Sequence, residues 1–557
     1  MIFKNSLLGR SEPARHLFVA SAVVSIGVLL LAQNLPPGAA AHLTPIYKLL
    51  FTVGDCQATV CALLILLVAA ATPVKFRARQ VLLWVGMHPI AVALATSMFL
   101  AIGSFLVYQN SRLSMDEYAQ YFQSQIFAAG HINGRLPVPL IDWLIPVGFQ
   151  NHFLVVSKLD GEVASAYWPS FALLLSPFTW LGIPWACNPV LSGATVLTIH
   201  RLALRIFAEA ESAGLAMLLT VASPVFFADG VSYYSMTAHL LANVAFALLL
   251  TEPTPRRAFA AGFVGSVALT LHNPLPHMLF AAPWIIYLFF RPGRARIALS
   301  LFAGYLPLCL LLGTGWFFHL SQLSHEGSAL APGSTALGDS LLRAYRIVTL
   351  PTATALLARL IGLAKIWAWA VPGLAILAMY GARKWWSNPQ CRLLCASALL
   401  TLVMFVIADQ GHGWGYRYFH SAWFTLPILG AAAFAKFPRG GELQPAQDSL
   451  ALTFVVAAAL LTLFAGIGLR AFQMRTFIEG HDRQVPQYMG TERRVVILNP
   501  SSAYYGADLV QNDPWLRSDV IRMITHGAIA DEQMMRENFS EMRRVYTDEF
   551  GSVWSAK

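Results

Sequence analysis

Apolar runs of about 20 residues recur along most of this 557-residue chain, separated by short polar or basic stretches. A run of that length crosses a bilayer as one helix. The pattern therefore predicts an all-α polytopic membrane protein with about thirteen transmembrane helices. We place the spans at about 16–33, 49–72, 81–108, 188–207, 212–228, 238–251, 258–272, 276–290, 297–318, 361–382, 393–409, 420–435 and 449–469.

Two long polar stretches interrupt this pattern. Residues 109–187 read as a large outer loop with amphipathic helices, and 470–557 as a polar tail with nearly balanced charges. In the tail, Arg494–Asn499 has the β-branched pattern of a strand, whereas 515–525 and 530–545 are interpreted as helices. The tail is thus predicted to form a small α/β domain.

These features divide the chain into three parts. Residues 1–80 form an N-terminal transmembrane hairpin, 81–469 a transmembrane domain that includes the outer loop, and 470–557 a C-terminal domain. Alternate loops carry 18 Lys and Arg on one face against 9 on the other. Because short cytoplasmic loops are the basic ones, the N-terminus is expected in the cytoplasm. An odd number of spans then places the C-terminal domain outside.

Composition agrees with a membrane protein. The chain is 57% hydrophobic and 12% charged, whereas soluble domains carry about 25% charged residues. Its net charge of +10 resides in loops between apolar runs, which argues against nucleic acid as a partner. The six cysteines suit neither a disulfide framework nor a zinc site. The sequence contains no nucleotide-binding loop and no zinc-peptidase motif.

The stretch Ser114–Gly130 is the first sizeable polar segment and the centre of the functional argument. Ser114 and Glu117 have the spacing of a capping box, which predicts a helix start. Apolar residues then recur at helical spacing, as in a helix lying on a membrane surface. Asp116 and Glu117 are either caps that complement the helix dipole or groups that do chemistry.

Other unusual polar residues also fall on the predicted outer face. Arg417 lies between Tyr416 and Tyr418 in a glycine-rich loop, a setting suited to gripping an anion. The alternative is an aromatic belt at the membrane interface, with the histidines as interfacial anchors. The remaining members of the set are Asp229 with Tyr233 and Tyr234, His239, His272, Asn273, His277, His412, Trp414 and His420.

The order of these features resembles the GT-C superfamily of membrane glycosyltransferases, near the protein O-mannosyltransferase and lipid A aminoarabinose transferase branch. The resemblance rests on Met115–Gly130 with its Asp-Glu pair, on Tyr167–Phe178, on Asn188–Phe207 and on Gly413–Phe419. Two departures stand out: Trp168-Pro169-Ser170 replaces a double proline, and His272-Asn273-Pro274 stands where relatives often have Arg-Pro.

The resemblance implies transfer of a sugar from a polyprenyl-phosphate donor to a hydroxyl of a glycan, lipid or protein, on the outer face of a bacterial inner membrane. Asp116 and Glu117 would be the catalytic pair, with Asp116 as the base, and direct displacement would invert the anomeric carbon. Arg417 would bind the donor phosphate, with Lys158 and Arg112 as alternatives. The remaining assignments put Tyr416 and Tyr418 beside the donor and Asp229, His239, His272, Asn273, His412 and Trp414 beside the sugar or acceptor.

Neither the sugar nor the acceptor can be named from the sequence. No cofactor is certain, and participation of a divalent metal is left open, because no carboxylate cage is evident. Two other functions fit parts of the pattern. A lipid-linked oligosaccharide polymerase or ligase would use outer arginines but leaves the acidic helix unexplained. A transporter or flippase would place ionisable residues near the bilayer midplane, often in two related halves, which this sequence lacks.

Overall fold

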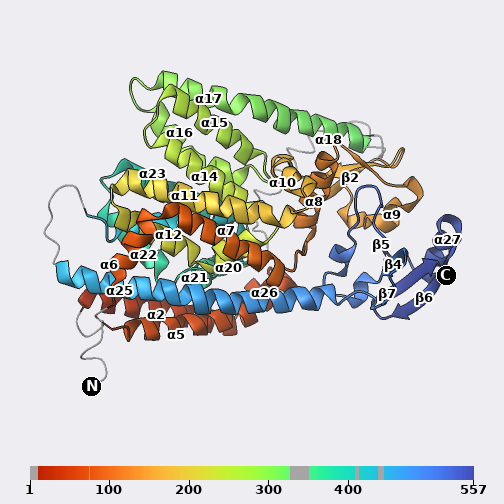
Figure 1. The fold of residues 1–557 in the computed structure, drawn as a ribbon, viewed down its shortest axis with the longest axis horizontal. Helices are drawn as coiled ribbons and strands as arrows, with labels where there is room; N and C mark the ends of the chain where they lie inside the picture. Colours follow the sequence, from red (N-terminus) through yellow and green to blue (C-terminus); the bar gives the residue numbers. More distant parts are fainter. Residues whose placement is uncertain (1–10, 74–75, 326–350, 408–412, 437–444, 557) are drawn as a thin grey trace.

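The computed structural model describes residues 11–73, 76–325, 351–407, 413–436 and 445–556. Long helices lie side by side in a bundle, and two mixed regions sit together at one end of it (Figure 1). We call this end the α8 end. The connection between the helices α16 and α17, which carries Arg291 and Arg294, lies at the opposite end. The predicted all-α membrane class is confirmed.

The bundle is built from long helices and shorter pieces that continue or join them. The long helices are α2 (Glu12–Gln33), α5 (Cys56–Ala70), α6 (Ala78–Met87), α7 (Pro89–Leu106), α11 (Cys187–Phe207), α12 (Ala210–Val221), α13 (Pro224–Val231), α14 (Met236–Leu250), α15 (Pro255–Leu269), α16 (Leu275–Phe289), α17 (Ala295–Leu308), α18 (Trp316–His325), α22 (Leu374–Lys384), α23 (Pro389–Ile407), α24 (Thr425–Ala432), α25 (Pro445–Leu461) and α26 (Ile467–Asp482). The shorter pieces are α3 (Pro37–Ala40), α4 (Pro45–Leu49), η1 (Leu50–Asp55), η5 (Cys309–Gly315), α20 (Ala353–Gly362), α21 (Ala364–Ala368), η6 (Arg417–Ala422) and η7 (Thr462–Gly466).

In the part of the chain that the structure describes, helical segments lie in each of the thirteen predicted spans, but they are not all long and continuous. Among the described residues, seven helical segments are long and apolar enough to cross a membrane, and an eighth qualifies if the bent pair α12–α13 counts as one span. Prolines explain two of the breaks. Pro89 separates α6 from α7, and Pro224 begins α13 after a bend of 62°. Proline lacks the backbone N–H that a helix interior requires.

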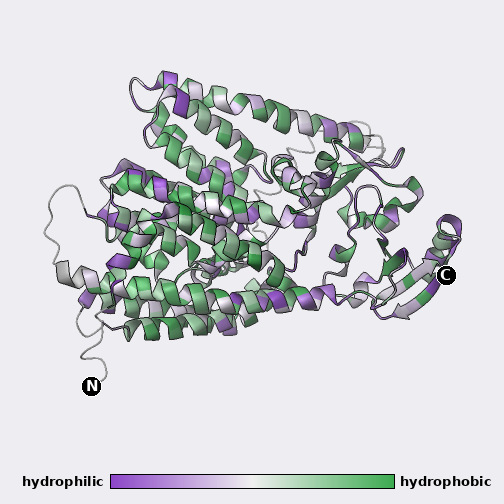
Figure 2. Ribbon diagram, viewed as in Figure 1, coloured by the Kyte–Doolittle hydropathy of each residue, from purple (hydrophilic) through white to green (hydrophobic). Residues whose placement is uncertain are grey.

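Glycines allow several helices to approach closely. A Cβ added to Gly262 on α15 would lie 2.0 Å from the carbonyl oxygen of Leu301 on α17, and one added to Gly304 would lie 2.1 Å from that of Phe259. Small residues facing each other in this way stabilise helix pairs in membranes, where apolar burial contributes little. The apolar residues at the bundle surface are suited to contact lipid (Figure 2).

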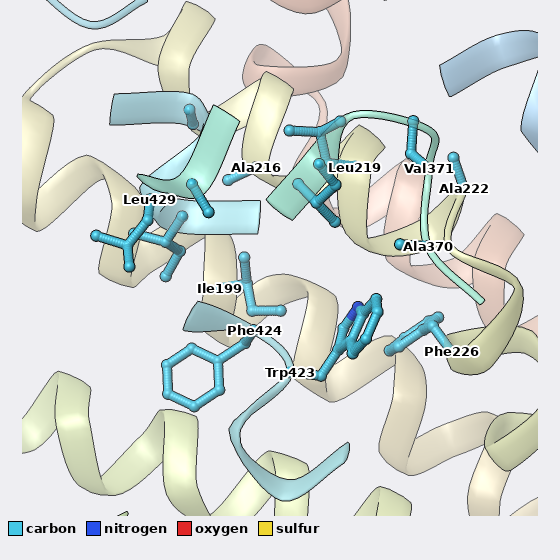
Figure 3. Close-up of a cluster of buried hydrophobic side chains, with 14 of the residues drawn as sticks. Ile199, Ala216, Leu219, Ala222, Phe226, Ala370, Val371, Trp423, Phe424 and Leu429 are labelled. Atoms are coloured by element: carbon cyan, nitrogen blue, oxygen red, sulfur yellow. The ribbon is translucent and has the colours of Figure 1, made fainter. Parts of the chain in front are cut away.

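A dense apolar core joins helices from both halves of the chain. Trp423 and Phe424 follow η6 and pack beside side chains of α11, α12, α13 and residues 370–371 (Figure 3). Both aromatic rings are buried completely or almost completely. This packing fixes η6, and therefore Arg417 at its first position, against the rest of the bundle.

The first mixed region at the α8 end spans the predicted outer loop. Its elements are α8 (Met115–Ala128), β1 (Gly134–Arg135), η2 (Val138–Leu140), α9 (Ile141–Leu144), η3 (Val147–Phe149), β2 (Leu154–Val156), β3 (Glu162–Ser165), α10 (Ser170–Trp180) and η4 (Pro184–Ala186). The strands form an antiparallel sheet in the order β1-β3-β2. This sheet, which the sequence did not predict, carries the chain from α8 back to the bundle.

The C-terminal domain is the small α/β unit that the sequence predicts. α26 continues past residue 470 to Asp482 before the domain begins. Its elements are β4 (Arg494–Leu498), η8 (Pro500–Ser502), η9 (Gly506–Leu509), β5 (Val520–Ile524), α27 (Ala528–Asn538), β6 (Met542–Asp548) and β7 (Gly551–Ala556). The four strands take the order β5-β4-β7-β6, with β4 and β5 parallel.

The residues that form one strand of this domain were wrongly predicted to be helical. The strand at Arg494 is confirmed, but residues 515–525, expected to be helical, contain β5. Its Val520, Ile521 and Ile524 pair with β4, and such tertiary pairing outweighs a weak local helical pattern. The helix expected over 530–545 ends at Asn538, after which the chain forms β6.

Candidate active site

α8 begins where the sequence predicts, but half of its capping box is used differently. The Glu117 carboxylate lies near the Ser114 backbone N–H, as in a capping box. The Ser114 hydroxyl does not cap the helix and instead lies 3.0 Å from the Tyr234 hydroxyl. The start of α8 is thereby tied to the segment between α13 and α14.

Asp116, in the first turn of α8, meets two groups from distant parts of the chain. Its Oδ2 accepts a hydrogen bond from Nη1 of Arg417 at 2.6 Å. Its Oδ1 accepts one from the Tyr167 hydroxyl, in the segment leading into α10. The Asp116 side chain is 23% exposed and that of Arg417 is 4% exposed. The cluster is therefore fixed on its Arg417 side and open to solvent on its Asp116 side.

The surroundings of Asp116 hold it ionised. Burial would raise the Asp116 pKa, but the positive charge of Arg417, the interaction with His272 and the Tyr167 hydrogen bond together lower it to about 2. An opposite charge within a few ångströms has this effect on a carboxyl group. A carboxylate held by arginine is a strong hydrogen-bond acceptor but a weak base.

Aromatic rings surround the Arg417 guanidinium. Its central carbon lies 4.5 Å from the ring centre of Tyr234 and 5.4 Å from that of Tyr418, a favourable cation–π arrangement. His272 stacks on Tyr167 with ring centres 4.4 Å apart. Nε of Arg417 and both ring nitrogens of His272 have no hydrogen-bond partner among the described residues. Buried polar atoms normally have partners, so this arrangement is suited to a polar ligand.

Glu117 occupies a different environment from its neighbour. Its side chain is fully buried and accepts hydrogen bonds from the Tyr108 hydroxyl at 2.9 and 3.1 Å and from the Tyr233 backbone at 2.8 Å. Burial raises its pKa to about 7 despite these donors. Glu117 was predicted to belong to the catalytic pair; its contacts suit a residue that anchors α8 to the bundle.

The two alternative phosphate ligands have other partners. Lys158 is half exposed and lies 2.8 Å from Asp142 in a salt bridge. Arg112 donates a hydrogen bond to the Asn110 carbonyl and lies over the Tyr121 ring at 4.4 Å. Neither has a contact with Asp116 or Arg417, so Arg417 is the arginine that the structure brings to Asp116.

The other predicted site residues are dispersed. Asp229 is buried and its Oδ2 lies 3.0 Å from Nδ1 of His420, while His277 contacts Asn243 and Tyr305 inside the bundle. His239 is buried in α14, and the Asn273 side chain accepts from the Leu275 backbone at the start of α16.

The glycine-rich loop is described in part. Trp414 packs edge-on against Phe477, and Tyr416 is buried with a hydroxyl that has no hydrogen-bond partner among the described residues. The Tyr418 ring stacks on Phe405. His412 lies outside the described residues.

Tyr167 and Tyr234 were not assigned as site residues from the sequence. Tyr167 opens the Tyr-Trp-Pro segment that carries part of the family resemblance, and Tyr234 adjoins Asp229 in a short polar stretch. An aromatic residue at the end of an outer loop has no distinctive pattern of its own. Its role becomes visible only when folding places the hydroxyl beside Asp116.

Within the described residues, no three His, Cys, Asp or Glu side chains are grouped as metal ligands usually are. The carboxylates of Asp116 and Glu117 are taken up by hydrogen-bond donors of this chain. Participation of a divalent metal is therefore a question for assay.

No protein-family model matches this chain, and no curated protein matches it by sequence. Solved structures do match. The chain is similar to ArnT from Cupriavidus metallidurans bound to undecaprenyl phosphate, with a TM-score of 0.51 and 11% identity over 84% of this chain and 97% of that one. The apo state of the same protein matches with a TM-score of 0.50 and 12% identity over the same shares. ArnT, the lipid A aminoarabinose transferase, has the GT-C fold, and this chain has that fold, as its sequence predicts.

Proposed function

We propose that this protein is a membrane glycosyltransferase that moves a sugar from a polyprenyl-phosphate donor to a hydroxyl acceptor at the outer face of the membrane. The observation that carries the proposal is the Asp116–Arg417 pair, 301 residues apart in sequence and 2.6 Å apart in space. A carboxylate that is partly open to solvent and a guanidinium beside it are the two groups that displacement of a phosphate by a hydroxyl requires. The fold shared with an undecaprenyl-phosphate-bound ArnT supports the choice of donor.

Arg417 is placed to take the phosphate of the donor. Its guanidinium can hold two phosphate oxygens at once, and its Nε is unpartnered among the described residues. Phosphate would compete with Asp116 for this cation. When Arg417 turns toward the donor, Asp116 loses its counter-charge and its pKa rises toward the ordinary value of a carboxyl group, about 4. Donor binding would thus make the base stronger at the moment it is needed.

The reaction then proceeds by a single displacement. The acceptor oxygen attacks the anomeric carbon and forms the new C–O bond while its proton moves to the Asp116 carboxylate. The bond between the anomeric carbon and the phosphate oxygen breaks, and the electron pair leaves with the polyprenyl phosphate. Arg417 stabilises the charge that develops on this leaving group. One inversion at the anomeric carbon follows from one displacement.

A transfer assay with purified protein tests the proposal. Radiolabelled sugars linked to polyprenyl monophosphate are offered with glycan and lipid acceptors, and labelled product is counted. Product that requires both donor and enzyme supports the function. If label is transferred from an oligosaccharide linked to a lipid diphosphate, and from no monophosphate donor, the protein would instead be the polymerase or ligase. Repeating the assay after EDTA treatment, with and without added Mg²⁺ or Mn²⁺, establishes metal dependence.

A further inference from the structure

The C-terminal domain holds α8 through a two-way hydrogen bond. The Tyr118 hydroxyl, one turn after the start of α8, donates to the Asn512 carbonyl at 2.6 Å and accepts from the Asn512 N–H at 2.8 Å. Both atoms of the Asn512 backbone are therefore satisfied by a single side chain of α8. The Tyr118 ring itself is buried, 4% exposed.

The Asn512 side chain continues this connection into the domain. Its Nδ2 donates to the Arg522 carbonyl at 2.8 Å and its Oδ1 accepts from the Arg522 N–H at 2.9 Å. Arg522 lies in the middle of β5, which pairs with β4. The path from the sheet to α8 thus runs through two pairs of hydrogen bonds and a single residue, which restrains both position and rotation. We call Tyr118, Asn512 and Arg522 the α8 clamp.

Two neighbours of the clamp reach the residues around Asp116. Gln511 donates to the Arg112 carbonyl at 2.7 Å, just before α8. Asp508 of η9 lies near the Met115 backbone, in the residue next to Asp116. Burial and the nearby charge of Asp116 raise the pKa of Asp508 to about 7. The domain therefore contacts the chain on both sides of Asp116.

We propose that the C-terminal domain is part of the catalytic unit and that Tyr118 is a positioning residue, which through the α8 clamp keeps Asp116 in the position that proton transfer from the acceptor requires. This inference rests on the proposed glycosyltransferase function. A misplacement of about 1 Å in a reacting group can lower a rate by about 100-fold. Because the bundle also holds α8 through Glu117, loss of the clamp alone is expected to shift Asp116 by less.

The substitution Tyr118→Phe removes the hydroxyl and keeps the ring, so the apolar packing survives. We expect kcat for transfer to fall about 10-fold while KM for the donor stays within twofold, because Tyr118 touches neither substrate. Tyr121→Phe is the matched control: its hydroxyl, on the same helix, has one hydrogen bond among the described residues, from Gln125 at 3.4 Å. Activity of this control should stay within twofold of the wild type.

Hydrogen exchange separates this inference from the proposed function. Amides of residues 112–120 should exchange faster in Tyr118→Phe than in Tyr121→Phe, whether or not a donor has been identified. Failure of the wild type to transfer any sugar would defeat the proposed function and leave the exchange comparison intact. Equal exchange in the two variants, or a Tyr118→Phe enzyme with wild-type kcat, would overturn the positioning role. An equal fall in kcat for Tyr121→Phe would do the same, since any hydroxyl on α8 would then matter.

Discussion

Two clusters in this molecule use the same chemical parts in different surroundings. In each, an aspartate accepts from an arginine and from an aromatic donor, and the arginine lies over an aromatic ring. At the α8 end these are Asp116, Arg417, Tyr167 and Tyr234. Inside the bundle, Arg470 lies over the Trp369 ring with its central carbon 3.9 Å from the ring centre and forms a salt bridge with Asp55 at 2.7 Å, and Trp369 donates to Asp55 at 2.7 Å.

The two clusters differ in their exposure to solvent and in the number of cations beside the aspartate. Asp116 is 23% exposed, whereas Asp55 is fully buried, and Lys365 adds a second cation 3.4 Å from Asp55. Arg470 is held further by the Ala368 carbonyl at 2.9 Å. The bundle cluster joins η1, α21 and α26, and its charged side chains Asp55, Lys365 and Arg470 are at most 2% exposed. The bundle cluster therefore connects helices to one another, whereas the same kinds of residue around the partly exposed Asp116 form a candidate site.

The substitution Asp116→Asn is expected to have the largest effect on transfer and therefore to distinguish the two clusters most clearly. If Asp116 is the base, transfer should fall by a factor of about 10²–10⁴, because the amide cannot take the acceptor proton. Loss of the charge opposite Arg417 should also lower the thermal midpoint, but by less than at Asp55, because Asp116 is 23% exposed. Transfer rate and thermal unfolding are measured on the same preparation. Near-normal turnover would remove Asp116 from the mechanism.

The substitution Asp55→Asn is expected to lower stability rather than turnover. Removing one partner of a buried charge cluster leaves uncompensated charge and costs about 3–5 kcal/mol. The thermal midpoint should drop strongly, while turnover per folded molecule is retained. The double variant Asp55→Asn with Arg470→Gln should recover part of the loss because it removes the unpaired guanidinium. A stable Asp55→Asn protein with low turnover would make this cluster part of the reaction.

A smaller effect is expected from Arg417→Lys. Lysine keeps the charge but cannot hold two phosphate oxygens in fixed geometry, so donor use should weaken while some turnover remains. Arg417→Ala should cost about 3–4 kcal/mol of transition-state stabilisation, as for other lost charge-stabilising donors. Donor and acceptor kinetics are measured separately, and acceptor affinity should change less. Wild-type donor kinetics in the lysine variant would indicate that Arg417 only anchors its loop at the interface.

The two clusters also show what could be predicted from the sequence. The Asp-Glu pair and the arginine among aromatic residues are visible in the sequence because charged residues are rare in this apolar chain and fall in its loops. Asp55 lies within the predicted span 49–72 and shows no pattern of its own, and Arg470 was assigned to the polar tail. A long-range pair can be recognised only when both partners are visible in sequence and folding brings them together.

Element boundaries follow the same rule. Thirteen apolar runs predict thirteen helical regions, because periodicity and length are local properties. Two of the breaks have a local signal in Pro89 and Pro224, whereas strand β5 depends on its pairing with β4. Ser114 illustrates this at one residue: local spacing predicts a capping hydroxyl, whereas the folded chain offers it Tyr234. The α8 clamp, formed by residues 394 positions apart, has no local signal at all.

The smallest effect concerns Glu117 and the pH dependence of stability. Its pKa rises from an ordinary 4.5 to about 7 in the folded protein, mainly through burial. Between these values the folded state binds a proton that the unfolded state has released, so stability should fall as pH rises from 4.5 to 7 and level off above. Glu117→Gln mimics the protonated form and should lose this part of the slope, with a thermal midpoint about 2–4 °C above wild type at pH 8.

Asp508, with a pKa raised to about 7, contributes a slope of the same sign in both proteins. The difference between wild type and variant therefore reports Glu117 alone. Identical slopes would show that the Tyr108 and Tyr233 hydrogen bonds keep Glu117 ionised throughout, and a variant without transfer activity would return it to the catalytic pair beside Asp116.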